Sequence, residues 1–423
     1  MVKKHFLFLL TLTAFVLGNT AVLGQTYHEV GNIKESEHFA EKAILVEDAN
    51  HELQVEDILN ESYDSENVIE VKNHIPYLDF TKSTYWMQLK IQNSEDVKHL
   101  YNLQLARPLT NIINLYIYDE NHNLIKKYNA GDDLAFKERP YLHKDFIFPI
   151  TIEPHVKYKL IVETTSDGEI LKLPMKFWEI NSFTQFASTE NFFLGLYYGL
   201  FLLVIIFFSF FGIALRQNIY LFFVSYVFFL GLFQFSLDGL AYQYLWPSSP
   251  WMGNHAILIF AAISLLSMLL YVRKFLEFSK EYKIYNTIYS IFIGLAFVGL
   301  VFSFLNGSLY AITFPTLNAL SFIVVFYFLY GIIIKAREGE KTDYPIVIAF
   351  IFLCLGAILF ILSNVNLIEN DFLASNALKV GSAFEVTFLS IAVASRYRKT
   401  QIEKINAQKE AVSALEEVNK LNS

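Results

Sequence analysis

The sequence predicts a multidomain membrane protein with an N-terminal all-β sandwich, a seven-helix transmembrane bundle and a short C-terminal helix. Three observations predict this order. Residues 191–395 hold seven apolar segments, each close to the roughly 20 residues that a helix needs to cross a hydrocarbon core of about 30 Å. Residues 25–183 instead alternate apolar and polar positions, as strands do. Residues 397–423 are polar with sparse apolar positions and contain no Gly or Pro, which suits a solvated helix.

Composition narrows the class of protein further. Charged residues make up 17% of the 423 residues, against roughly 25% in soluble domains. The net charge of −8 offers no basic surface, so we expect no nucleic-acid partner. The single cysteine, Cys354, excludes an intramolecular disulfide, which favours a bacterial source for an exported domain.

Residues 1–24 are typical of a signal peptide. Lys3 and Lys4 form a basic start, residues 6–16 are apolar, and small residues precede a cleavage site before Gln25. The alternative is an uncleaved anchor helix, although the apolar run is short for one.

The exported domain, residues 25–183, shows its strands by alternation. In residues 83–93 one face carries Tyr85, Met87, Leu89 and Ile91, and the other carries Trp86, Gln88 and Lys90. This alternation predicts a half-buried strand. Other segments at 100–106, 112–130 and 146–152 behave similarly, which points to an antiparallel sandwich. The stretch 47–66, rich in Asp, Glu and Asn, is predicted to be loop.

The membrane domain, residues 188–396, is expected to be helical because lipid offers no partner to free backbone groups. The predicted spans are 191–213, 219–239, 256–275, 285–305, 309–334, 345–364 and 373–395. Lys and Arg follow spans one, three, five and seven, whereas the opposite loops have none. Because positive loops face the cytoplasm, the N-terminus is predicted outside and the C-terminus inside.

The tail, residues 397–423, fits two heptad registers. The first places Ile405, Val412 and Asn419 at a, with Gln408, Leu415 and Asn422 at d. The second places Ala411 and Val418 at a, with Ala407, Ala414 and Leu421 at d. The sequence does not choose between them, and an unpaired solvated helix is the alternative to a coiled coil.

Four polar residues within the predicted spans are candidates for a functional role. Glu385 sits near the middle of span seven, where an ionisable group is costly and suggests function; the alternative is a side chain that only ties two helices together. Gln234 and Asp238 lie near the outer end of span two, and Asp238 is interpreted as interfacial. Asn318 in span five is expected to bond to another helix.

In the exported domain Trp86, Arg107 and Arg139 are the candidate ligand-binding residues. Trp86 could stack on a sugar ring, or pack beneath a loop. Each arginine precedes a proline and could bind an anion, or pair with nearby carboxylates. No metal-ligand cluster, phosphate loop or nucleophile motif is present, so we expect no cofactor, no metal and no catalytic module.

The chain resembles the bacterial seven-transmembrane receptors with diverse intracellular signalling modules. The resemblance rests on "LGLYYGLFLLVIIFFSFF", "YVRKFLEF" and "GSAFEVTFLSIAVASRYR" in the membrane domain, and on "YWMQLKIQN" and "ERPYLHKDFIFPITI" in the exported domain. It implies a jelly-roll sandwich related to carbohydrate-binding modules, and hence a saccharide-like ligand. Family members continue into a kinase, cyclase or similar module; this chain ends within the connecting helix, so the resemblance implies a truncated chain or an output in trans.

The expected function is that of a receptor in a bacterial inner membrane. The sandwich would bind a periplasmic ligand, and the bundle would pass a conformational change to the tail, paired in a homodimer, and to a cytoplasmic effector. A transporter or channel, an intramembrane enzyme, and an anchor that presents the sandwich to a protein are the alternatives.

Overall fold

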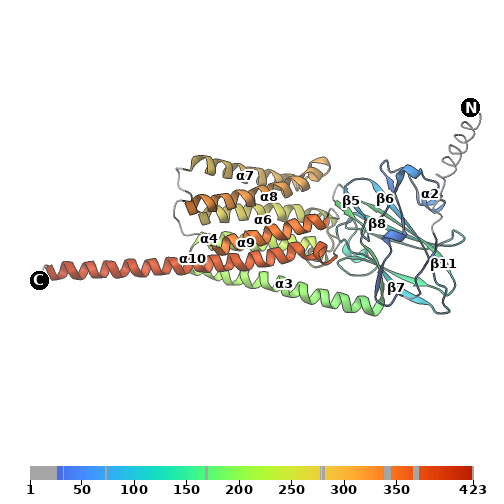
Figure 1. The fold of residues 1–423 in the computed structure, drawn as a ribbon, viewed down its shortest axis with the longest axis horizontal. Coiled ribbons are helices and arrows are strands. Elements are labelled where there is room, and N and C mark those ends of the chain that lie inside the picture. Colours follow the sequence, from blue (N-terminus) through green and yellow to red (C-terminus); the bar gives the residue numbers. More distant parts are fainter. Residues whose placement is uncertain are drawn as a thin grey trace, which may run out of the picture.

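The protein consists of a β-domain placed at one end of a helical bundle, with one long helix leaving the bundle at the other end (Figure 1). The computed structural model describes residues 26–421 apart from 32, 72–73, 167–169, 277, 279–281, 338–343 and 365–370. The predicted signal peptide therefore lies outside the described residues. We call the end of the bundle that meets the β-domain the sandwich end, and the other the far end.

Two main sheets make up the β-domain. A seven-stranded sheet has the order β4-β3-β6-β11-β8-β9, with β1 beside β6. Its strands are β1 (His28–Glu29), β3 (Ile44–Asp48), β4 (Val68–Ile69), β6 (Thr84–Gln92), β8 (Ile112–Asp119), β9 (Leu124–Ala130) and β11 (Lys157–Thr165). A four-stranded sheet, β10-β7-β13-β2, comprises β2 (Ser36–His38), β7 (His99–Leu105), β10 (Phe146–Ile152) and β13 (Met175–Glu179). The strands β5 (Tyr77–Phe80) and β12 (Ile170–Lys172) form a small third sheet.

The inner faces of the two main sheets form one hydrophobic core, as a sandwich requires. The predicted inward face of β6 is confirmed, because Met87, Leu89 and Ile91 are buried in this core. Phe146 and Phe148 of β10 meet them from the opposite sheet. The strand order does not test the jelly-roll form, which stays a prediction.

The outer face of β6 is also buried, so the prediction of a half-buried strand was wrong. A short helix, α2 (Val55–Leu59), covers this face and places Ile58 and Leu59 against Trp86. Two polar residues of this face have local partners: Gln88 donates to the Ile58 carbonyl at 3.2 Å, and Lys90 pairs with Glu61 at 2.6 Å. The region 47–66 was predicted as loop, but it contains α2. The helix was not predicted because its few apolar residues lie among many acidic and polar ones.

Seven described helices are long and apolar enough to cross a membrane. They are α3 (Ile180–Leu215), α4 (Asn218–Leu237), α6 (Pro250–Leu276), α7 (Lys283–Phe302), α8 (Ser308–Arg337), α9 (Tyr344–Asn364) and α10 (Asp371–Leu421), with a short α5 (Leu240–Tyr244) after α4. Three short 3₁₀ turns span Ala40–Lys42, Ser65–Asn67 and Phe136–Glu138. The seven long helices confirm the predicted number of spans.

Two of these helices, α3 and α10, run far past their predicted spans and extend beyond the bundle. The helix α3 starts at Ile180, directly after β13, and Glu179 caps it by accepting from the Ser182 N–H at 2.8 Å. The sandwich is therefore joined to the first span without a linker. At the other end α10 is a single helix of 51 residues, so the tail continues span seven instead of forming a separate element.

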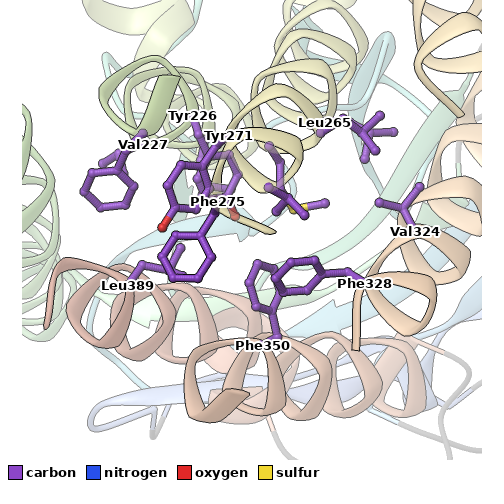
Figure 2. Packing of buried hydrophobic residues seen from close by; sticks show 14 of the residues in the cluster. Tyr226, Val227, Leu265, Tyr271, Phe275, Val324, Phe328, Phe350 and Leu389 are labelled. Carbon is purple, nitrogen blue, oxygen red and sulfur yellow. The ribbon is translucent and has the colours of Figure 1, made fainter. Parts of the chain in front are cut away.

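Aromatic residues from several helices fill the bundle core. Figure 2 shows Tyr226 and Tyr271 close together near Phe275, and Phe328 of α8 against Phe350 of α9. The ring centroids of Phe328 and Phe350 are 4.4 Å apart. Leu389 of α10 is fully buried in the same cluster, so the N-terminal part of α10 belongs to the bundle.

The burial of Trp86 predicts a loss of stability on truncation. Trp86→Ala should lower the free energy of unfolding of the sandwich by about 3–5 kcal/mol, since a large buried ring leaves a cavity. Thermal unfolding of the purified full chain measures this. The control is Leu124→Ala at a half-exposed position of β9, and an equal effect of both variants would contradict the assignment.

Candidate functional site: the junction of sandwich and bundle

Charged and polar contacts join the sandwich to the sandwich end of the bundle. We call this contact the junction; it joins loop residues 107–111 and 131–145 to the adjacent ends of α3, α4, α5 and α6. Four features build it: an aromatic cluster, a backbone contact, a buried arginine and an ionic network.

The aromatic cluster fixes the first turns of α3 against the sandwich. Phe183 is 1% exposed and packs with Ile147 and Trp178. Trp178 also stacks on Phe186, with centroids 4.7 Å apart. Because these side chains come from β10, β13 and α3, they pack the start of α3 directly against the four-stranded sheet.

A second contact joins the loop 131–136 to α5 and α6. The Phe136 N–H donates to the Pro247 carbonyl at 2.9 Å, and Tyr242 donates to the Leu134 carbonyl at 2.5 Å. Asn254 of α6 donates to Asp133 at 2.6 Å. These bonds hold the loop directly on the end of the bundle.

Arg139 lies at the centre of the junction and is 5% exposed. Its guanidinium donates to the carbonyls of His143 and Lys144 at 2.9 and 2.7 Å, and its carbon lies 4.1 Å from the ring centre of Phe146. Burial lowers the pKa of Arg139 to about 10. Arg139 was a candidate ligand residue; its two bonds go to backbone carbonyls of its own loop, so we assign it to shaping the junction.

Lys144 is the centre of the ionic network. Its ammonium lies 3.0 Å from Glu190 of α3 and 3.3 Å from Asp145. Burial alone would lower the pKa of Lys144, but Asp145, Glu190 and Asp238 outweigh it and raise the pKa above its usual value. A sandwich cation is therefore held by carboxylates of both domains.

Asp145 and His143 complete the sandwich side of the network. Burial opposes ionisation of Asp145, but Lys144, His143 and a 2.7 Å bond from Gln104 keep its pKa below its usual value. Burial lowers the pKa of His143, whose Nδ1 accepts from the Asp145 N–H at 3.1 Å. At neutral pH, therefore, Asp145 is a carboxylate and His143 beside it is a neutral imidazole.

Asp238 connects this network to α10. It caps α4 and is 8% exposed. Its carboxylate lies 2.7 Å from Lys379 of α10 and accepts from Tyr198 of α3 at 2.6 Å. Asp238 was interpreted as merely interfacial, but the structure buries it as the partner of an intramembrane lysine.

After Lys379, toward the far end, α10 makes two further polar contacts with the bundle. Ser382 lies 2.8 Å from the Tyr197 hydroxyl of α3, and Glu385 accepts from Tyr226 of α4 at 2.5 Å. Glu385 is 0% exposed. Lys379, Ser382 and Glu385 are three residues apart, so they share one face of α10. We call this face the polar ladder; Glu385 ties α4 to α10, as one of its two interpretations requires.

The other predicted residues do not join this site. Trp86 is 3% exposed beneath α2, as its packing interpretation requires. Arg107 is half-buried beside Lys172, whose pKa is lowered to about 8 by burial and by the Arg107 charge. Gln234 is buried in α4 one turn before Asp238. Asn318 is exposed on α8, and its expected bond to another helix stays a prediction.

Lys144, Glu190 and Lys379 were not among the predicted site residues. A signal existed for Lys379, because a cation within an apolar span needs an anionic partner at the same depth, and Asp238 is the acid at that depth. Lys144 lies in an ordinary loop, and its sequence context gives no such signal.

Close packing at Gly239 predicts a variant that opens the junction. Gly239 has φ +75°, and a Cβ there would lie 2.5 Å from Pro108 Cβ of the sandwich. Gly239→Ala should raise the exchange rate of the Phe136 amide, which donates across the junction, on the order of 5–150-fold. Gly307→Ala is the control, because Gly307 has φ +76° and open space around it. Equal exchange in both variants would contradict this role of Gly239.

Acidification should loosen the sandwich. Because the folded-state pKa of His143 is lowered, its contribution to stability is present above the unfolded value near 6.5 and is lost as pH falls below it. Asp145 adds a second loss below about pH 4. The midpoint of thermal unfolding should therefore fall between pH 7.5 and 5, and should fall less in His143→Gln. The exposed His74→Gln is the control, and an unchanged acid response in His143→Gln would contradict the assignment.

Comparison with known families agrees with this architecture. Residues 190–396 match the family model described as 7TM diverse intracellular signalling. Residues 41–179 match the model described as 7TMR-DISM extracellular 2. A search of curated proteins found no match. With both the extracellular and the membrane domain matched in the order in which the fold presents them, the chain belongs to the 7TMR-DISM family of multi-pass membrane receptors.

Proposed function

We propose that this receptor senses a ligand through its sandwich and reports binding through α10 to a cytoplasmic effector or output module. The observation that supports this most directly is the continuity of α10. The same helix is bonded to Asp238 at the junction and extends past the far end of the bundle. A change at the junction therefore acts on an element that ends on the other side of the membrane.

The junction has the chemistry of a two-state contact. Its charges are paired, and Lys144, Asp145 and Asp238 are buried, so removing one partner leaves an uncompensated buried charge. Water would have to enter if the sandwich moved away from the bundle. A ligand that binds the sandwich more tightly in one arrangement would shift the equilibrium by its difference in affinity.

The polar ladder gives α10 discrete positions instead of a continuous range. Lys379, Ser382 and Glu385 each bond to a specific partner on α3 or α4. Sliding or rotating α10 would break these bonds together in a region where no solvent replaces them. A relay by small, concerted shifts of α10 is consistent with this constraint.

The orientation follows from the charges at the far end. Arg216, Arg273 and Lys335 lie at the far ends of α3, α6 and α8. Arg396 lies midway along α10 and donates to the Phe275 carbonyl near the far end of α6. Positive residues favour the cytoplasmic side, so we place the sandwich in the periplasm of a bacterial cell and the end of α10 in the cytoplasm. A saccharide is the first ligand class to test, because the resemblance of the sandwich to carbohydrate-binding modules suggests it.

Lys144→Ala tests the relay without knowledge of the ligand. It removes the cation shared by Glu190 and Asp145, and it should change amide exchange along α10 by about 5–150-fold in the full chain in lipid nanodiscs. Hydrogen–deuterium exchange of residues 376–413 measures it.

Lys90→Ala is the matched control for that measurement. Lys90 is also a buried sandwich lysine that pairs with a glutamate, Glu61. It lies on the outer face of β6, which α2 covers, and not at the junction. If Lys144→Ala alters exchange only within the sandwich, the chain acts as an anchor for the sandwich and the relay is refuted.

A further inference from the structure

We propose that α10 pairs with α10 of a second copy of this chain along one seam that begins inside the membrane and continues into the tail. This deepens the proposed function, on which it rests, by naming what the output helix contacts. The seam consists of the residues Val380, Phe384, Thr387, Ile391, Ala394, Arg398, Gln401, Ile405, Gln408 and Val412.

The membrane part of this seam is defined by exposure. Between residues 376 and 394, the exposed side chains of α10 are the five whose spacing alternates between four and three residues: Val380, Phe384, Thr387, Ile391 and Ala394. Val380, Phe384 and Ile391 are 44–46% exposed. Spacings of four and three residues define the a and d positions of a coiled coil.

The seam continues in phase beyond the bundle. Counting on in heptads from Phe384 and Ile391 leads through Arg398 to Ile405 and Val412, which are 49% and 56% exposed. Lipid can cover Phe384 and Ile391, but it cannot cover Val412 at this distance past the bundle. An apolar stripe on a helix that projects alone needs another helix, and a copy of the same helix carries the same stripe.

This phase also decides between the two tail registers. When the second register is continued toward the N-terminus of α10, its d positions fall on Lys379, Val386 and Val393. Lys379 is paired with Asp238, and Val386 and Val393 are 0% and 2% exposed within their own bundle. The second register therefore leads into a face that is already occupied, whereas the first leads into the exposed face.

Polar residues in the seam explain why the tail pattern is weak in sequence. Arg398 and Gln401 occupy an a and a d position just beyond the bundle, and Gln408 occupies the next d. The long side chain of Arg398 can extend away from the seam toward lipid headgroups. In a parallel pair, Lys404 at g faces Lys409 at e of the next heptad, so like charges oppose each other there.

Cysteine crosslinking of the full chain in native membranes tests the seam. On a Cys354→Ser background, Val412→Cys and Ile391→Cys should form disulfide-linked dimers under mild oxidation, because a disulfide requires Cα atoms about 4.4–6.8 Å apart. Glu410→Cys is the matched control; it lies two residues away on the opposite, f position. A crosslink at Val412 and Ile391 but not at Glu410 supports the seam. Equal crosslinking at Glu410 and Val412, or no crosslink at Val412, overturns it.

A charge reversal checks the register independently. Lys404→Glu should increase the dimer fraction by roughly two- to tenfold, since it turns the repulsion between Lys404 and Lys409 into attraction. Lys399→Glu makes the same charge change off the seam and should have no effect. In the second register Lys404 would occupy an a position, and its reversal would bring no gain; that result overturns the proposal. A relay in Lys144→Ala without any pairing of α10 would leave the proposed function standing while refuting the seam.

Discussion

The paired charges at the junction are the constraint on which the arrangement of the two domains depends. Lys144, Asp145 and Asp238 are buried and would each be unfavourable without a partner, and the half-buried Glu190 and Lys379 pair with them. They are tolerable because each cation lies within ion-pair distance of an acid, and because the acids come from both domains. Removing the sandwich from the bundle would leave Glu190 without its lysine. The ionic network therefore specifies one docked position, even if its net contribution to stability is small.

The helix α10 can act as an output because its two faces differ. One face carries the polar ladder and is bonded to α3 and α4, whereas the opposite face is apolar and exposed. All backbone bonds of a helix lie within the helix, so 51 residues can span about 76 Å without support from other elements. Such a rod transmits rotation or displacement from one end to the other, which a chain with a loop at the membrane boundary would not.

Much of the fold could be predicted because hydrophobic periodicity determines it. The inward face of β6 and the number of spans follow from patterns within single segments. Properties that depend on partners could not be predicted. Trp86 is covered by α2, which the acidic stretch 47–66 conceals, and Asp238 acquires its role only from Lys379, more than a hundred residues later in the chain. For Asn318 the polarity suggested a partner helix, and the packing of α8 leaves the side chain exposed.

Two helices, α3 and α10, extend beyond the bundle at opposite ends, and they touch each other. The helix α3 enters directly from β13 without a linker, so a tilt of the sandwich must move its first turns. Tyr197, two turns after Glu190 in α3, bonds through its hydroxyl to Ser382 of α10. The next residue, Tyr198, donates to the Asp238 carboxylate, which pairs with Lys379. A covalent path through α3 and an electrostatic path through Lys144 and Asp238 thus converge within one turn of α10. Because both paths meet at the same turn, the contacts that lead from the sandwich to α10 through α3 and through Asp238 hold one and the same segment of α10.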